Sequence, residues 1–306
     1  MTRSLLWGAS LLAIVLVLPN ASALAHGFAG QRFFPATIAT DDPFVSDELS
    51  APTVSTVRNS GEGGGQEIDT SIDVSKRITP NFGLGFAETW QHFSNAPSGF
   101  GNLELSAKYQ LLVDAPHEAL LAVGVDAEVG GTGARKVGAD RFSTVTPTLF
   151  FGKGMGDLPD SMKWLKPLAV TGTLGFGFPT RASTVTDPDS GDVERHSNTF
   201  ETGLAIEYNL QYLQSSVQDI GLPAPFNRMI PLVEFAFSTP FNRGQNGLTT
   251  GTINPGVAWA GRYFQLTAEA IIPANNRSGR NVGGVVQLHF FLDDIFPTTI
   301  GRPIFQ

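Results

Sequence analysis

Acidic side chains are the residues of this 306-residue chain whose type and spacing could do chemistry. They alternate with apolar residues along several segments, so that the carboxylates of each segment share one face. The set comprises Asp69, Asp73, Glu104, Asp126, Glu128, Glu201, Glu207, Glu234 and Glu269. Fixed carboxylates along a narrow passage raise the local concentration of cations. If the segments enclose a lumen, we expect it to be lined by these acids and to favour cations or neutral polar solutes over anions.

A second interpretation of the same acids stays open. They could fill a packed polar interior and pair with arginines from loops or with the N-terminal segment. Lys108 is the clearest base on the polar faces. The acid pattern alone does not decide between a conducting lumen and a packed one.

Other chemistries find little support. Cysteine is absent, so neither a disulfide nor a thiolate metal site can form. The five histidines show no metal-ligand spacing, and no G-x-S-x-G motif is present. We therefore expect no catalytic residues, no metal site and no cofactor. A hydrolase that works through paired carboxylates remains an alternative.

The elements that must position these acids are β-strands. Apolar and polar residues alternate with period two in residues 102–111, 121–129, 201–212 and 263–272, which is typical of strands with one apolar face. Many such segments are roughly 9 to 13 residues long, enough for a tilted strand to cross a bilayer. We count about twelve, an even number as in bacterial barrels: 52–58, 66–76, 81–93, 101–112, 118–129, 142–151, 166–178, 199–213, 229–238, 251–260, 262–272 and 281–291.

The connections alternate between long and short. Long glycine-rich or charged loops alternate with tight turns, as external loops alternate with periplasmic turns in outer-membrane barrels. The even connections 152–165 and 214–228 are longer and could each hold a helical turn. Residues 179–198 form the best candidate for a constriction or an external contact, because loops of that length are usually functional or disordered.

The N-terminus resembles a secretory signal. Arg3 precedes an apolar stretch, Leu5–Leu18, and Ala23-Leu24-Ala25 fits a small-x-small cleavage site. After Ala25 no apolar run of about 18 residues appears, so we expect no membrane-spanning helix. The predicted plan is a signal peptide (1–25), an irregular N-terminal extension that is flexible or folded against the barrel mouth (26–50), an outer-membrane β-barrel (51–291) and a C-terminal tail (292–306).

Two motifs carry a resemblance to a family. The turn RITPNFGLG (77–85) and the closing strand NVGGVVQLHFFL (281–292), with the strand ladder, resemble Gram-negative outer-membrane barrels of the transporter-like or "MetA-pathway of phenol degradation" type. The resemblance covers residues 51–291. It implies a barrel that passes small solutes, including aromatic or hydrophobic ones, and it brings no catalytic or binding residues.

The combined prediction is an all-β fold, a single antiparallel transmembrane β-barrel of about 12 strands in the bacterial outer membrane. The expected partners are outer-membrane lipid, a small-molecule solute and the barrel insertion machinery. Nucleic acid is not expected, because the net charge is −8. We expect passage or uptake of small solutes and no enzyme activity. The alternatives are a structural or adhesion barrel with a blocked lumen, an outer-membrane hydrolase, and two stacked soluble β-domains.

Overall fold

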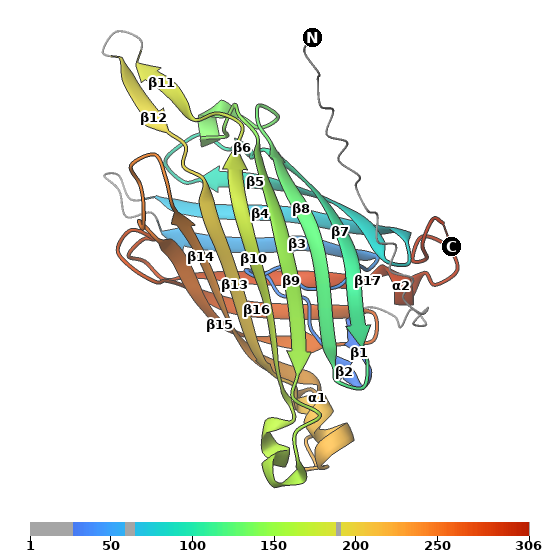
Figure 1. The fold of residues 1–306 in the computed structure, drawn as a ribbon. Coiled ribbons are helices and arrows are strands. Elements are labelled where there is room, and N and C mark those ends of the chain that lie inside the picture. The colour runs from blue at the N-terminus through green and yellow to red at the C-terminus, as the bar shows by residue number, and fades with distance from the viewer. Residues whose placement is uncertain (1–26, 59–64, 188–190, 306) are drawn as a thin grey trace, which may run out of the picture.

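The computed structural model describes residues 27–58, 65–187 and 191–305, and the predicted signal peptide 1–25 lies outside the described residues. Within the described ranges, twelve long strands form one antiparallel ring (Figure 1). They are β3 (Glu48–Arg58), β4 (Gln66–Thr79), β5 (Phe82–Phe93), β7 (Leu103–Asp114), β8 (Ala119–Val129), β9 (Thr144–Gly154), β10 (Leu168–Pro179), β13 (Thr199–Tyr208), β14 (Met229–Pro240), β15 (Thr250–Ala260), β16 (Phe264–Pro273) and β17 (Gly283–Phe291).

The ring closes without a free edge. Each long strand pairs with the next along the chain, and the last strand, β17, pairs with the first, β3. The predicted closed antiparallel barrel of twelve strands is thus confirmed, and two stacked β-domains are not what the chain forms. The ring begins at Glu48, so residues 48–50 of the expected extension belong to the barrel wall.

The wall is apolar outside and, away from the apolar contacts of the N-terminal residues, polar inside. On β16, Gln265 and Thr267 are buried while Leu266, between them, is exposed. Large apolar side chains are exposed on the outer face of strand after strand, namely Leu84, Leu105, Val125, Leu149, Leu174, Leu266 and Val286. This inverts the usual distribution in a soluble globule, because the apolar side chains lie outside and the polar ones inside.

The two ends of the barrel differ. At one end, tight turns join β4 to β5, β7 to β8 and β15 to β16, and two longer connections carry the expected helical turns. The expected turns are η2 (Asp160–Leu165), η3 (Leu213–Val217) and η4 (Phe226–Arg228), whereas α1 (Leu210–Tyr212) is helical where the strand 199–213 was expected to continue. No helix of the described residues is long and apolar enough to cross a membrane.

At the opposite end lie the long loops, with β6 (Gly99–Phe100) and η1 (Arg135–Val137). The loop 179–198 contains a hairpin, β11 (Ser183–Asp187) and β12 (Asp192–Arg195), that projects away from the ring (Figure 1). Its described part therefore does not form a constriction in the lumen.

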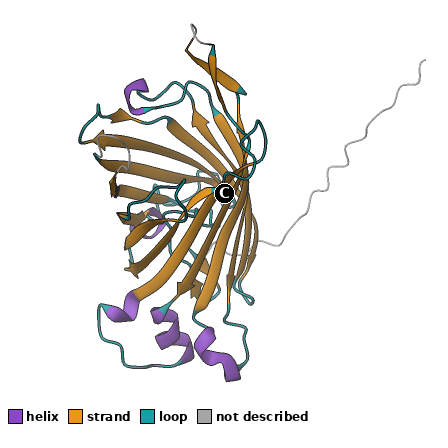
Figure 2. Ribbon diagram, turned by 90° about the vertical axis from the view of Figure 1, so that its left-hand side faces the viewer, coloured by secondary structure: helices purple, strands orange, loops and turns teal. Residues whose placement is uncertain are grey.

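Residues 27–47, called here the inserted segment, lie inside the ring of strands, where their side chains pack with several strands. Figure 2 shows loop backbone within the ring. The segment starts with a small hairpin, β1 (Phe28–Ala29) and β2 (Arg32–Phe33). Phe33 packs with a buried cluster on β14, β15 and β17, whereas Phe34 packs with Leu120 and Ala169. The hydrophobic core of the molecule therefore lies between the inserted segment and the barrel wall. After β17 a short helix, α2 (Leu292–Ile295), begins the C-terminal tail.

Candidate functional site

Arg32 fixes the start of the inserted segment. Its side chain is fully buried, and its Nε lies 3.1 Å from Oε2 of Glu118, just before β8. Its Nη1 donates to the carbonyl oxygen of Pro167 at 2.9 Å, and its guanidinium stacks 3.6 Å from the ring centre of Tyr212. Burial of an arginine is tolerated here because a carboxylate, carbonyl groups and an aromatic face surround it.

Glu234 on β14 holds the middle of the inserted segment. Its carboxylate accepts hydrogen bonds from the backbone N–H groups of Ile38, Ala39 and Thr40 at 2.8, 3.0 and 2.6 Å. Gln265 on β16 donates from Nε2 to the carbonyl oxygen of Ala36 at 2.6 Å. The backbone of residues 36–40 pairs with no neighbouring strand, so its buried polar groups need other hydrogen-bond partners. Side chains of the wall provide them.

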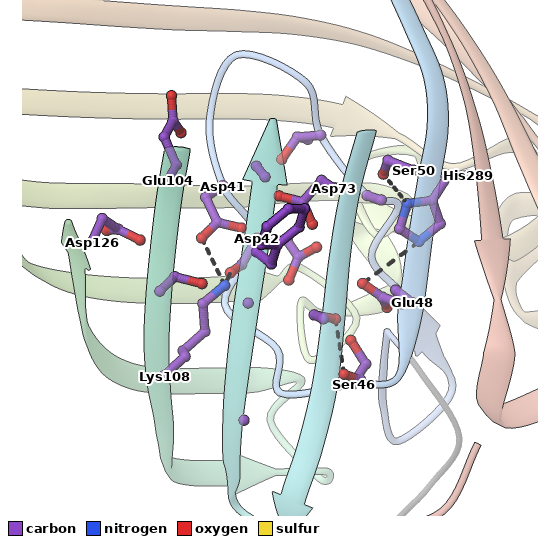
Figure 3. Close-up of a pocket in the computed structure, with 18 of the residues that line it drawn as sticks. Asp41, Asp42, Ser46, Glu48, Ser50, Asp73, Glu104, Lys108, Asp126 and His289 are labelled. Atoms are coloured by element: carbon purple, nitrogen blue, oxygen red, sulfur yellow. Dashed lines mark hydrogen bonds and ion pairs between the residues drawn. The ribbon is translucent and has the colours of Figure 1, made fainter. Parts of the chain in front are cut away.

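A cavity of about 450 Å³ lies between the inserted segment and β3, β4, β5, β7, β8 and β17 (Figure 3). Small residues on β5, Gly83, Gly85 and Ala87, line it and help to leave this part of the lumen open. A Cβ at Gly85 would lie 2.1 Å from Oγ of Ser106, so a larger residue there would push the Ser106 hydroxyl aside. The volume falls within the range of small-molecule sites.

The lining of this cavity is strongly acidic. Its ionisable residues include one lysine, Lys108, and one histidine, His289. The acids come from both the inserted segment and the wall, and they are Asp41, Asp42, Glu48, Asp73, Glu104 and Asp126 (Figure 3).

The basic groups of the lining are already paired. Lys108 Nζ lies 2.8 Å from Oδ2 of Asp41 and donates to the carbonyl oxygen of Asp42 at 2.7 Å. His289 Nδ1 is 2.8 Å from Oγ of Ser50, and its Nε2 is 3.5 Å from Oε2 of Glu48. Burial, and to a lesser degree the neighbouring Glu48, raises the pKa of Asp42 to about 7.

The nine acids expected from the sequence separate into groups. Asp73, Glu104 and Asp126 line the cavity. Glu201 lines a second cavity of about 260 Å³, which shares Ala39 with the first. The structure thus brings three of the nine to one site and places a fourth at a neighbouring one.

The remaining five acids lie elsewhere. Glu234 binds the inserted segment, and Glu269 is buried on β16. Glu207 is buried, with Oε1 3.5 Å from Oγ1 of Thr171. Glu128 accepts a hydrogen bond from Asn102 at 2.8 Å. Asp69 on β4 lines neither cavity.

Sequence reasoning missed the contribution of the inserted segment. Asp41, Asp42 and Glu48 complete the lining, and they belong to a stretch without a strand period. The one available signal was a concentration of acids, Asp41-Asp42 and Asp47-Glu48, immediately before the first strand. His289, Ser50 and Gln287 were likewise not expected at a site.

Metal binding finds no support in the same geometry. Across the described ranges, no group of three or more His, Cys, Asp or Glu side chains could hold a metal ion. The cavity acids lie on several different walls and do not converge on one point (Figure 3). The arrangement can supply a negative potential and hydrogen-bond acceptors to a solute.

The fold has relatives among solved structures. One is the NanC porin, with a TM-score of 0.50 and 11% identity, matching 79% of this chain and 99% of that protein. Another is an outer membrane channel from Pseudomonas putida F1, with a TM-score of 0.55 and 12% identity, matching 82% of this chain and 96% of that protein. At these identities the similarity concerns the fold. The sequence matches no protein-family model and no curated protein sequence.

Proposed function

We propose that this chain is a channel of the bacterial outer membrane that passes or takes up small solutes through a lumen narrowed by the inserted segment. The observation that carries the proposal is the acidic cavity between that segment and the barrel wall. Around it stands a closed ring with an apolar outer face, the kind of sheet that can span lipid without an unpaired edge. The NanC porin and the Pseudomonas channel share the fold and support this choice.

The charge of the lining favours a cationic or neutral polar solute. Six acids face one lysine and one histidine around the cavity, and both bases are paired with acids. An excess of fixed negative charge in a confined passage attracts cations and repels anions. The aromatic or hydrophobic solutes implied by the MetA-pathway resemblance fit this lining less well, because such solutes need apolar walls.

Conductance of the purified chain in planar bilayers tests the proposal. In a KCl gradient we expect measurable current and a reversal potential of the sign set by K⁺ permeation. The triple variant Asp73→Asn, Glu104→Gln, Asp126→Asn should lose much of this preference. Glu128→Gln is the matched control, because Glu128 lies outside both cavities. Anion selectivity of the unaltered protein would overturn the selectivity part of the proposal.

A barrel with a blocked lumen is the second candidate. It is favoured by the buried contacts that tie the inserted segment to β14 and β16 and to the turn before β8. Removal of residues 27–44 separates the two candidates. A blocked barrel conducts only after the deletion, whereas a narrowed channel conducts before it and carries a larger current afterwards.

A further inference from the structure

An unsatisfied acceptor in the cavity wall points to a bound ligand. Gln287 on β17 lines the cavity and is 7% exposed. Its Nε2 donates to Oγ1 of Thr53 at 3.1 Å, whereas its Oε1 has no hydrogen-bond partner among the described residues. A buried amide oxygen without a donor costs free energy, so such an atom marks a place where a donor is to be expected. This observation is independent of the carboxylates around it.

The charge balance indicates which kind of donor fits. Lys108 is engaged by Asp41, and His289 lies between Ser50 and Glu48. The wall acids Asp73, Glu104 and Asp126 therefore share the cavity with no further cationic side chain in its lining. An occupant that carries positive charge and N–H donors would balance these carboxylates. It would also donate to the buried amide oxygen of Gln287 once that side chain turned toward the cavity.

The size of the cavity indicates an organic molecule. A volume of about 450 Å³ is far larger than a dehydrated metal ion needs, and the described residues offer no metal-ligand cluster. The acids come from β3, β4, β7 and β8 on the wall and from the inserted segment, so they surround a volume and do not chelate a point (Figure 3). A chain-like cation with its charges separated would meet carboxylates on more than one wall.

We propose that this cavity is a binding site for small organic cations of the alkylamine class, with Asp73, Glu104 and Asp126 as the charge partners and Gln287 as a neutral acceptor. The inference deepens the proposed function by naming its solute class, and it rests on that function for the route by which the solute arrives. Binding itself is a property of the folded barrel and can be measured without transport.

Three probes of equal length and different charge test the proposal. Calorimetry on the full mature chain in zwitterionic detergent at low salt compares 1,5-diaminopentane, 1,5-pentanediol and glutarate. We expect saturable binding of the diamine, and binding of the diol and the dicarboxylate weaker by at least about tenfold, since each lost charge-assisted hydrogen bond costs roughly 1.5–3 kcal/mol. Equal binding of all three probes, or no binding of the diamine, would overturn the inference.

Variants assign the binding to this cavity. Glu104→Gln and Asp73→Asn change charge with little change in shape, and each should weaken diamine binding by about fivefold or more. Glu201→Gln is the matched control, because Glu201 lines the second cavity and not the first. Ala87→Leu supplies an independent readout, because it fills space at the lining and leaves every charge in place. The proposal fails if these three cavity variants bind the diamine as the control does while retaining the barrel's heat-modifiable mobility on gels.

The outcomes distinguish this inference from the proposed function. A barrel that conducts K⁺ but does not bind the diamine keeps the channel and loses the amine site. A barrel that binds the diamine without conducting keeps the amine site and supports the blocked lumen.

Discussion

The carboxylate of Glu234 on β14 accepts a hydrogen bond of 2.6 Å from the backbone N–H of Thr40 in the inserted segment. Ile38 and Ala39 donate to the same carboxylate. One wall residue thus provides the partners for three consecutive backbone groups of a segment that has no strand ladder there. All three backbone N–H groups of residues 38–40 therefore share this one carboxylate.

Replacing Glu234 by alanine should release the middle of the inserted segment. The change leaves three N–H groups without an acceptor, at a cost of about 1–3 kcal/mol each if they stay buried. We expect faster protease cleavage within residues 27–47 and a larger single-channel conductance. Glu201→Ala is the control, because Glu201 accepts from Ser238 on the neighbouring strand and not from the inserted segment. Unchanged cleavage of the Glu234 variant would contradict this role.

Arg32→Met should detach the start of the same segment. The substitution leaves the buried carboxylate of Glu118 without its cation, and breaking a buried pair in this way costs about 3–5 kcal/mol. Hydrogen–deuterium exchange of residues 28–34 should rise markedly. Adding Glu118→Gln should restore part of the protection, because the unpaired charge is then gone. Lys163→Met is a control expected to change nothing in that region, because Lys163 is half-buried and bonds to Gln218 instead of the inserted segment.

The attachment of the inserted segment should weaken as the pH rises. The pKa of Asp42 is about 7 in the folded chain against 3.8 for a free aspartate, because burial and the nearby Glu48 disfavour its charge. Between these two pH values the attached segment holds a proton that a detached one has released. Raising the pH through this window therefore favours detachment.

Proteolysis of the segment at about pH 5 and about pH 8 measures this dependence. We expect faster cleavage at the higher pH. Asp42→Asn cannot titrate, so its cleavage rate should change less between the two conditions, once the protease's own pH response is subtracted. An equal pH response in both proteins would show that Asp42 does not control the attachment.

Leu149→Arg tests the membrane setting of the outer wall. Leu149 lies at the middle of β9 and is 37% exposed on the outer face. An arginine near the bilayer midplane of a barrel costs about 2–4 kcal/mol. Folding into lipid vesicles, followed by denaturant titration, should show that loss. Leu248→Arg is the control, since Leu248 is similarly exposed (41%) but lies in the loop between β14 and β15. Equal stability of the two variants would count against a lipid-facing wall.

The strands could be predicted from the sequence, because a half-buried strand leaves a period of two. In β16, the order Gln265, Leu266, Thr267 already separates inside from outside, and the burial of these residues follows it. Closure was inferred from the expected membrane setting, because strands that cross lipid must leave no unpaired edge. The count of about twelve strands agrees with the twelve long strands of the ring.

The site could be predicted only in part. The strand period puts Asp73, Glu104 and Asp126 on the inner face, and they do line one cavity. It gives no information about residues 27–47, whose place is fixed by long-range contacts such as Arg32 to Glu118 and Thr40 to Glu234. The cavity depends on how that segment divides the lumen. Its acids Asp41 and Asp42 could therefore not be assigned from a local pattern.

The entry to the first wall strand and the exit from the last lie side by side. The backbone N–H of Leu292 donates to the carbonyl oxygen of Asp47 at 2.9 Å. Arg77 donates from Nε to Oδ2 of Asp47 and from Nη2 to the carbonyl oxygen of Gly301. A label attached to the C-terminal tail would consequently report on the compartment at this end of the barrel. An epitope placed in the β11–β12 hairpin would report on the compartment at the opposite end of the barrel. Accessibility of the two labels on intact cells therefore gives the orientation of the protein in the membrane.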